Sequence, residues 1–301
     1  MKQHFEIVAV MAIGPNSKLE YILDTLNSFL YYTTSTHKII ILDNTRKNVS
    51  SEIKKAIPDI DILTIDKVSG TLAKLYVNLS IAFKYAIDNY TFDALMKIDD
   101  DALVIGESPE KEVIQLFKEN PKVGIAGMHV YGQYPLDFAG NKWDNNYART
   151  TILVGTCTWK LLKRPFVNLA LRKLVLKAFY NGYEIGEYIF GGTYFFSEDF
   201  IEKLDKAGYL PLYKIRNAIL ADDHIFSLLA KVVGLEFGDL ATGDLPLGLW
   251  WKELPASPEM LLQRKKKIIH STRKWENMNE DDIRDYFKKL RQKKENLTPI
   301  I

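Results

Sequence analysis

Residues Ala94 to Asp101 read ALMKIDDD, and this stretch decides the fold. A mostly apolar run that stops at three consecutive aspartates is typical of a strand buried in a sheet, with the acids at its carboxyl end. Adjacent carboxylates repel one another and lose hydration when they are buried, and a hard divalent cation removes that penalty because Mg²⁺ and Mn²⁺ prefer oxygen ligands. The stretch therefore predicts a metal site, with a solvated turn after the strand as the alternative.

Three similar apolar runs precede this strand and alternate with helical patterns. We expect strands at residues 5–13, 38–42 and 60–65, and helices at residues 19–30, 49–57 and 71–89. Ser17 stands where it can cap the first of these helices. Alternation at this spacing predicts right-handed crossovers and a mostly parallel α/β sheet. Since ligands bind beyond the carboxyl ends of parallel strands, Asp43 at the end of the second strand should share one rim with the acidic triplet.

The alternation becomes less regular after residue 105. We expect further helices at residues 108–119, 161–179, 197–206, 221–233 and 281–294, and further strands at residues 122–126, 150–159 and 194–196. The sequence contains no internal repeat and no clean linker. This organisation predicts one catalytic domain over residues 1–275, with a nucleotide-binding half (1–105) and an acceptor half (106–275), followed by a basic helical tail over residues 276–301.

The composition excludes several classes of protein. Lysine and arginine number 40 and aspartate and glutamate 38, so the net charge of +2 gives no field of one sign, and we expect no nucleic-acid partner. The single cysteine, Cys157, excludes a disulfide framework and a cysteine-based zinc site and suits a reducing compartment. No apolar run approaches the roughly 20 residues that span a bilayer. We therefore expect a cytoplasmic protein.

Absent motifs narrow the chemistry further. No GxGxxG follows the first strand and the chain has no GxxxxGK[ST], which argues against dinucleotide-binding and P-loop proteins. The chain also has no GxSxG, which argues against a nucleophilic hydrolase. The acidic motifs are therefore the best guide to function.

A second acidic motif, ADDHIFS, begins at Ala221. Asp222 and Asp223 fall in the first turn of an expected helix, where the helix dipole favours negative charge, and this alone is a sufficient reason for their position. A carboxylate held at a helix start is also well oriented to act as a general base that takes a proton from an attacking hydroxyl group. Both interpretations stay open.

A third motif, IIHSTRKW, covers residues 268–275. His270 follows two apolar residues, so it is either a histidine at the end of a core strand or an imidazole that completes the metal site. Arg273 and Lys274 follow closely enough to reach phosphate oxygens beside it. Of the five histidines, only His270 has this combination of neighbours.

A fourth motif, GGTYFF, starts at Gly191. The paired Gly191 and Gly192 allow the backbone to approach a ligand closely, and Tyr194 with Phe195 offers a face on which a sugar could stack. A tight turn that feeds a core strand explains the two glycines equally well.

Together these motifs resemble metal-dependent glycosyltransferases of the GT-A fold, a fold of nucleotide-diphospho-sugar transferases. The chain is most similar to the β-1,3-galactosyltransferase-type family and, more broadly, to family-two transferases. The motifs that carry the resemblance are, in order, YVNLS (76–80), MKIDDD (96–101), GGTYFFSED (191–199) and DDHIFS (222–227). The sequence departs from the family where Asp222 stands in place of a glutamate and Ser227 in place of a glycine.

The resemblance implies a metal-dependent, inverting transfer of a sugar from a nucleotide sugar, expected to be a UDP-sugar, to a hydroxyl group of a glycan or lipid-linked acceptor. Asp99, Asp101 and His270 would hold Mn²⁺ or Mg²⁺, and Asp223 would be the catalytic base. The resemblance also implies nucleotide contacts by Asp43, Lys74, Asn78, Asp99 and Asp100, phosphate contacts by Arg273 and Lys274, and sugar or acceptor contacts by Gly191, Gly192, Tyr194, Asp222, Trp250 and Trp251.

Two other functional classes fit the same residues. One is another Mg²⁺- or Mn²⁺-dependent phosphate-handling enzyme, a nucleotidyltransferase or a phosphohydrolase, and the other is a non-catalytic glycan-binding module. Trp250 and Trp251, in an irregular segment, either cover the site and stack on the acceptor or anchor a long loop in the core.

The balanced net charge conceals two basic segments. Residues 264–301 carry 12 basic and 6 acidic side chains, and residues 160–177 carry six basic and no acidic side chains among apolar ones. The second segment is either an ordinary surface helix with its apolar face in the core or a site of peripheral contact with anionic lipid.

Overall fold

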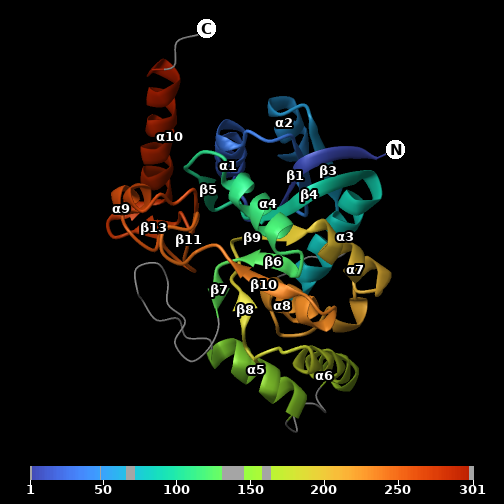
Figure 1. Ribbon diagram of the computed structural model, residues 1–301. Coiled ribbons are helices and arrows are strands. Elements are labelled where there is room, and N and C mark those ends of the chain that lie inside the picture. The colour runs from blue at the N-terminus through green and yellow to red at the C-terminus, as the bar shows by residue number, and fades with distance from the viewer. Residues whose placement is uncertain (1, 48, 66–71, 131–145, 158–163, 298–301) are drawn as a thin grey trace.

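The computed structural model describes residues 2–47, 49–65, 72–130, 146–157 and 164–297. Its centre is a seven-stranded sheet in the order β10-β6-β9-β4-β1-β2-β3 (Figure 1). The strands are β1 (Gln3–Ile13), β2 (His37–Asp43), β3 (Ile60–Thr64), β4 (Tyr90–Ile98), β6 (Val123–Gly127), β9 (Thr193–Ser197) and β10 (Glu236–Asp239). All run parallel except β9, which is antiparallel to both of its neighbours, β4 and β6. The predicted mostly parallel α/β sheet is confirmed.

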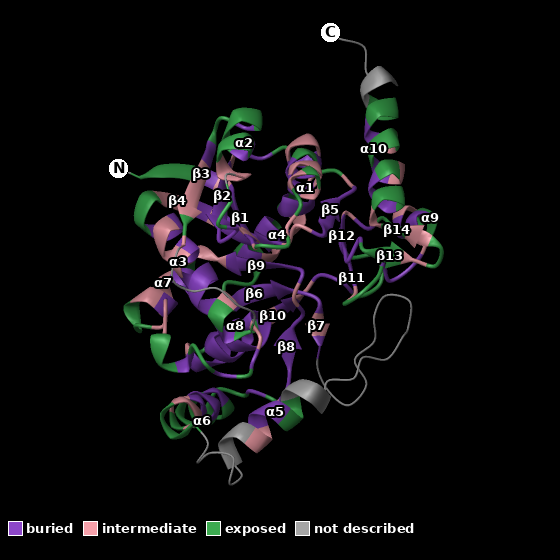
Figure 2. Cartoon of the chain, turned by 180° about the vertical axis from the view of Figure 1, so that it is seen from behind, coloured by how far each residue is buried: buried purple, intermediate pink, exposed green. Residues whose placement is uncertain are grey.

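Helices cover both faces of this sheet (Figures 1 and 2). One face carries α1 (Leu19–Tyr32), α2 (Val49–Ala56) and α4 (Pro109–Glu119), and the other carries α3 (Ala73–Asn89), α7 (Glu198–Lys206) and α8 (Asp222–Val232). The two cores explain the unbroken apolar run of β1, because successive residues of a strand point to opposite faces. Val8 and Val10 belong to the core with α3 and α8, whereas Ile7, Ala9 and Met11 belong to the core with α1 and α4.

A smaller sheet, in the order β11-β12-β5, continues from the carboxyl end of β4. Its strands are β5 (Ala102–Val104), β11 (Leu247–Leu249) and β12 (Ile268–His270), and α9 (Pro258–Gln263) and α10 (Glu280–Leu297) lie beside it. Leu103 and Ile269 pack with Ile283 and Phe287 of α10 in a core separate from the other two. The predicted C-terminal helix is therefore present, and it is fastened to the strands that follow the acidic triplet.

The remaining elements are short or lie at one end of the molecule. Two-residue strands pair as β7 (His129–Val130) with β8 (Tyr188–Ile189) and as β13 (Lys274–Trp275) with β14 (Met278–Asn279). The helices α5 (Asn146–Cys157) and α6 (Pro165–Tyr180) lie together at the bottom of Figure 1, and the 3-10 turn η2 (Tyr213–Ile215) packs against α6.

Two local predictions are corrected. The strand expected at residues 150–159 is wrong, because residues as far as Cys157 belong to α5, which packs on α6 instead of pairing in a sheet; residues 158 and 159 lie outside the described residues. The cap expected at Ser17 is also wrong, since α1 begins at Leu19 and its cap position is Lys18. The Ser17 hydroxyl instead accepts a hydrogen bond from the N–H of Gly14 at 3.0 Å and closes the turn after β1.

Candidate active site

The acidic triplet lies where the central sheet meets the small sheet. β4 ends at Ile98, and the N–H of Asp99 then donates a hydrogen bond to the carbonyl of Gly192 at 3.0 Å. The chain continues into β5, whose Ala102 lies opposite His270 in the antiparallel pairing of β5 with β12. This pairing brings two motifs that are far apart in the sequence into one site.

Asp99, Asp101 and His270 form the group that fits a metal ion. The Nε2 atom of His270 is 3.2 Å from Oδ1 of Asp101 and 3.9 Å from Oδ2 of Asp99. One ligand atom from each residue lies within 4.8 Å of the others, and Asp101 and His270 are buried. Two carboxylates and one imidazole converging on one point are a donor set that suits a divalent cation.

The imidazole of His270 is held in the orientation that a ligand needs. Its Nδ1 atom lies 2.9 Å from the carbonyl oxygen of Trp250, to which it donates, so Nε2 is directed at the carboxylates. Gly192 packs against the ring with a backbone φ of +92°, and a Cβ there would lie 2.6 Å from the Cγ and Nδ1 atoms of His270. Glycine is required at 192 both by its backbone conformation and by the ring beside it.

Positive charge balances Asp101 in the structure as it stands. Burial opposes ionisation of Asp101, but His270, Arg273 and the Ser271 hydroxyl outweigh burial and lower its pKa. Arg273 places Nε 2.9 Å from Oδ2 of Asp101. Burial likewise opposes the charge of His270, but Asp101 and Asp99 outweigh it and raise the pKa of the imidazole. A proton on His270 and a metal ion would therefore compete for the same position.

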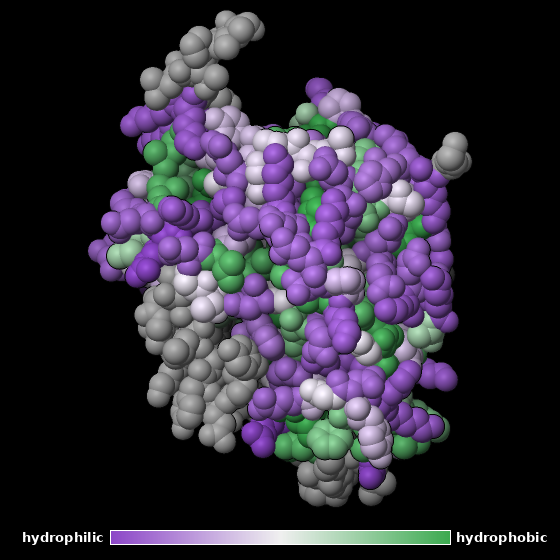
Figure 3. Space-filling model, viewed as in Figure 1, coloured by the Kyte–Doolittle hydropathy of each residue, from purple (hydrophilic) through white to green (hydrophobic). Residues whose placement is uncertain are grey.

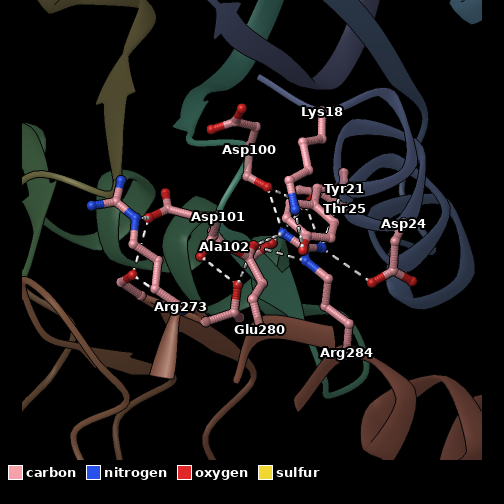
Figure 4. Close-up of polar contacts among 12 residues, drawn as sticks. Lys18, Tyr21, Asp24, Thr25, Asp100, Asp101, Ala102, Arg273, Glu280 and Arg284 are labelled. Atoms are coloured by element: carbon pink, nitrogen blue, oxygen red, sulfur yellow. Dashed lines mark hydrogen bonds and ion pairs between the residues drawn. The ribbon is translucent and has the colours of Figure 1, made fainter. Parts of the chain in front are cut away.

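Side chains of α10 and of the turn after β12 donate hydrogen bonds to the main chain of the acidic triplet. Arg284, which is 5% exposed, donates to the main-chain oxygen of Asp100 at 2.6 Å and pairs with Asp24 at 3.1 Å. The N–H and hydroxyl of Thr272 donate to the main-chain oxygen of Asp101 at 2.9 and 3.0 Å. Figure 4 shows the carbonyl of Asp100 directed at Arg284 and the carboxylate of Asp101 directed at Arg273.

Sequence reasoning missed Arg284 because it assigned the last helix to a basic tail. A signal was present: Ile283 and Phe287 are apolar at a spacing of four, and Arg284 and Arg291 stand seven apart beside them. That pattern predicts a helix with one face against the protein and arginines at its edge. Both arginines pair with Asp24 of α1.

A fully buried lysine, Lys97, connects the two acidic motifs. Its Nζ atom is 2.6 Å from Oδ1 of Asp99. Burial opposes its charge, but the carboxylates of Asp99, Asp222 and Asp223 outweigh burial and raise its pKa. Lys97 thus supplies one buried positive charge to the acids on both sides of it.

Asp222 faces inward from the start of α8. Its Oδ2 atom accepts a hydrogen bond from the Tyr194 hydroxyl at 2.6 Å. Burial raises the pKa of Asp222 to about 6; the charge of Lys97 opposes this shift, and repulsion by Asp223 adds to it. The predicted sugar-stacking face is wrong, because Tyr194 and Phe195 lie on a central strand and are fully buried.

Asp223, the predicted base, is held at both oxygens. Oδ2 accepts from the N–H of Gly191 at 2.9 Å, and Oδ1 accepts from the N–H of His224 at 2.8 Å and lies 2.7 Å from its Nδ1. The His224 ring stacks on Tyr188 at 4.2 Å. Burial opposes ionisation, but His224 outweighs burial and lowers the pKa of Asp223. A Cβ at Gly191 would lie 3.1 Å from Oδ2, so glycine permits the carboxylate to approach the main chain.

The residues expected to contact the nucleotide lie on several elements. Asp43 ends β2, and its carboxylate closes the next turn: Oδ1 accepts from the N–H of Thr45 at 2.7 Å and Oδ2 accepts from the Ser50 hydroxyl. Asn78 is buried on α3. Burial raises the pKa of Asp100, against the effect of the Ser17 hydroxyl. Among the described residues, the metal-binding group brings together Asp99, Asp101 and His270 but none of these others.

The residues after β11 and β12 flank the metal-binding group. Trp250 contributes its carbonyl oxygen to His270, whereas Trp251 is 63% exposed and has Nζ of Lys252 4.4 Å from its ring centroid. Lys274 is exposed on β13. Of the two predicted phosphate contacts, only Arg273 borders the metal-binding group in this structure.

A cavity of about 660 Å³ lies between the first turns of α3 and α6 and the segment that leads into α8. Lys74, Arg164 and Arg216 line it together with apolar side chains that include Leu72, Val167 and Ile219. The guanidinium of Arg164 donates to the carbonyl of Asn217, which ties the α6 wall to the α8 wall. The cavity therefore combines positive charge with apolar surface. The last of its lining residues, Ile219, precedes Asp222 by three residues in the sequence.

Comparison with known proteins shows the fold. No family model matches the chain, and no curated protein matches it in sequence. Its structure is similar to that of a bifunctional glycosyltransferase, WbbM, in the apo state, with a TM-score of 0.53, 11% identity and coverage of 94% of this chain and 50% of the other.

Two other solved structures match part of this chain more weakly. One is a mannosyltransferase of Pyrobaculum calidifontis in complex with GDP-mannose and Mn²⁺, with a TM-score of 0.44, 12% identity and coverage of 79% of this chain and 56% of the other. The second is TarS of S. aureus, residues 1–349, with a TM-score of 0.45, 12% identity and coverage of 78% and 58%. The chain spans between half and three fifths of the length of these solved proteins. The likeness to WbbM confirms the predicted glycosyltransferase fold.

Proposed function

We propose that this protein is a metal-dependent glycosyltransferase that transfers a sugar from a nucleotide sugar to a hydroxyl group of a glycan or lipid-linked acceptor, with inversion at the anomeric carbon. One observation carries the proposal. An oriented Asp-Asp-His group and a separate Asp223, whose pKa is lowered, both interact with the charge of the buried Lys97, in a glycosyltransferase fold. Such a reaction needs a place for the leaving diphosphate and a base for the acceptor hydroxyl.

The donor diphosphate would bind at the metal-binding group. Asp99, Asp101 and His270 would hold Mn²⁺ or Mg²⁺, and the cation, when bound, supplies a Lewis acid that stabilises negative charge on the departing nucleoside diphosphate. Arg273 now pairs with Asp101 and is 59% exposed at its side chain, so it is positioned to exchange that carboxylate for a phosphate oxygen. Lys274 would add a second, more distant positive charge.

The nucleoside would extend over the ends of the first four strands. Asp43 is the last residue of β2, and Asp100 follows β4. Lys74 and Asn78 lie on the first two turns of α3, which begins beyond the end of β3. A UDP-sugar is the donor that the resemblance to β-1,3-galactosyltransferases favours. Direct comparison of uridine and guanosine nucleotides tests that choice.

Asp223 would accept the proton of the acceptor hydroxyl as that oxygen attacks the anomeric carbon. The N–H of Gly191 fixes the direction of its carboxylate, and His224 lowers its pKa, which favours the ionised form that a general base requires. Attack from the face opposite the leaving diphosphate inverts the configuration. Asp222 would support the base from within the protein, through its bond to Tyr194.

The acceptor would enter through the cavity that precedes α8. Lys74, Arg164 and Arg216 suit a phosphate group, and the apolar lining suits a hydrocarbon chain, so the cavity favours a lipid-linked acceptor over a neutral glycan. The exposed ring of Trp251 offers a separate face for a sugar ring.

Thermal unfolding of the protein in the presence of nucleotides tests this proposal. UDP or GDP with Mn²⁺ should stabilise the native protein, by about 2.7 kcal/mol at one hundred times the dissociation constant, and Asp101→Ala should lose the metal-dependent part. Release of a nucleoside diphosphate from a nucleotide sugar would support transfer. Release of phosphate or pyrophosphate would instead indicate the other phosphate-handling enzymes, and binding of a glycan without turnover would indicate a binding module.

A further inference from the structure

Helix α6 is apolar on two opposite sides. Its inner side buries Leu171, Leu174, Val175 and Ala178, at the spacing of one helix face. Its outer side is exposed and carries Phe166, Leu169, Leu176, Phe179 and Tyr180; Phe166 and Tyr180 are 87% and 85% exposed. A surface helix normally shows polar side chains on its outer side, so the outer face of α6 calls for a partner.

The exposed apolar side chains of the molecule gather around this helix. Among the described residues, eleven large apolar side chains are exposed, and eight of them lie on α6, directly before α3 or in the segment around η2. Besides the five on α6, they are Leu72, Tyr213 and Ile219. Figure 3 shows hydrophobic side chains at the bottom of the molecule, over α6, with hydrophilic ones beside them. We call these eight residues the α6 patch.

Basic side chains stand beside the α6 patch, on the same two segments of the chain. No acidic residue occurs between Arg164 and Tyr183 or between Ala207 and Ala221. Exposed cations stand among the apolar side chains, at Arg164, Arg172, Lys173, Lys177, Lys214 and Arg216. Long basic side chains can lay their stems on apolar surface and reach outward with the charge, which suits the headgroup region of an anionic bilayer.

The charge pattern favours a lipid surface over a second copy of this chain. Two copies joined through the α6 patch would bring like charges together without an acidic partner. No helix of the described residues is long and apolar enough to cross a membrane. An amphipathic helix with this composition instead lies in the plane of the interface.

We propose that the α6 patch docks on the surface of a bilayer that contains anionic lipid, with the axis of α6 parallel to that surface. The inference rests on the exposed side chains and their charges, not on the proposed transfer reaction. Docking in this orientation would place the cavity at the start of α6, with Arg164 and Arg216, at the level of the lipid headgroups.

Co-sedimentation of the full chain with vesicles tests the proposal. Binding to phosphatidylcholine vesicles that contain 30% phosphatidylglycerol should exceed binding to pure phosphatidylcholine at least tenfold and should weaken as salt rises from 0.1 to 0.5 M. Equal binding to both vesicles, or none to either, would overturn it. No donor or acceptor is present, so failure of docking and failure of the transfer reaction are distinguishable.

Matched variants identify the surface. Leu169→Ser with Leu176→Ser should reduce partitioning at least tenfold, whereas Leu245→Ser with Met260→Ser, which removes two exposed apolar side chains elsewhere, should leave it unchanged. Lys173→Glu with Lys177→Glu should also reduce partitioning at least tenfold, as Leu169→Ser with Leu176→Ser does.

The charge-matched control is Lys288→Glu with Lys289→Glu, on exposed positions of α10. Equal losses in patch and control variants would overturn the assignment of the patch, as would a concentration-dependent dimer that only the patch variants abolish. All positions are exposed, so circular dichroism and the melting temperature should stay unchanged in every variant.

Discussion

The two acidic motifs hold their carboxylates in different ways. At the metal-binding group, Asp101 is paired with His270 and Arg273. A cation can take the place of the proton on His270, and a diphosphate can take the place of Asp101 as the partner of Arg273. At the start of α8, the main-chain N–H of Gly191 and the adjacent His224 hold Asp223. The first arrangement permits exchange of partners, and the second keeps one orientation throughout. Binding a metal requires the former, and repeated proton transfer at one atom requires the latter.

The sharpest break between the two motifs comes from Asp223→Asn. An amide cannot accept the acceptor proton, so transfer should fall about 10²- to 10⁴-fold while Mn²⁺-dependent nucleotide binding stays within about twofold of the native value. Single-turnover assays and calorimetric titration of the same preparation measure the two effects. Full transfer by Asp223→Asn would remove Asp223 from the base role.

The pH dependence of stability sharpens the same contrast. Burial raises the pKa of Asp222 to about 6, above its ordinary 3.8, so the folded state binds its proton more tightly than the unfolded state. Protonated Asp222 therefore stabilises the folded state fully below about pH 4, and this contribution is lost as the pH rises through about 6. The free energy of unfolding should fall by on the order of 3 kcal/mol over this range.

Asp222→Asn should remove that dependence. The difference in free energy of unfolding between variant and native protein should grow between pH 4 and pH 6.5 and stay constant above it, because the amide of Asn can still accept from Tyr194. Urea unfolding at a series of pH values measures this. If the difference in free energy of unfolding does not change with pH, the proton is held by Asp223 and not by Asp222.

The two adjacent glycines allow the motifs to be disturbed separately. Gly192→Ala should push the His270 ring and lower Mn²⁺ affinity about 10- to 100-fold, while Gly191→Ala should lower the rate of transfer and leave Mn²⁺ affinity unchanged. Gly182→Ala is the control for strain, because Gly182 has a φ of +81° and open space around its Cβ position. Loss of Mn²⁺ affinity in Gly182→Ala would show that strain alone is responsible.

The smallest expected effect tests whether α10 positions the triplet. Arg284→Ala removes the donor to the Asp100 carbonyl and should lower Mn²⁺ affinity about tenfold. Arg291→Ala removes the other arginine that pairs with Asp24 and should leave Mn²⁺ affinity unchanged, because the donor to the Asp100 carbonyl is Arg284. Calorimetric titration of both variants, at a temperature where both are folded, measures the difference. Equal affinities would reduce Arg284 to a structural role.

The fold and the centre of the metal-binding group were predictable from the sequence, because their signals are local. The alternation of apolar runs and helices predicts the sheet, and the triplet after β4 predicts an acidic rim. His270 was identified by its neighbours and lies beside Asp101 and Asp99, as expected of a ligand.

The remaining features depend on contacts between distant segments, which sequence patterns do not contain. Gly191 and Gly192, which were predicted to lie beside the donor sugar, also accommodate the side chains of Asp223 and His270. The sequence pattern predicted that Tyr194 contacts a sugar. Its burial could not be predicted, because it depends on the position of β9 between β4 and β6. The run TILVG in α5 is compatible with helix or strand, and packing against α6 decides between them.

The pairing of β5 with β12 determines when, during synthesis of the chain, the acidic triplet meets its partners. Asp101 and Ser271, which hydrogen-bond to each other, are separated by 170 residues. At a synthesis rate of about 5–20 residues per second, the acidic triplet leaves the ribosome roughly 10–30 s before His270 and Arg273. During that interval the early strands can form while the triplet lacks both its imidazole and its guanidinium. The group formed by Asp99, Asp101 and His270 is therefore complete only near the end of synthesis.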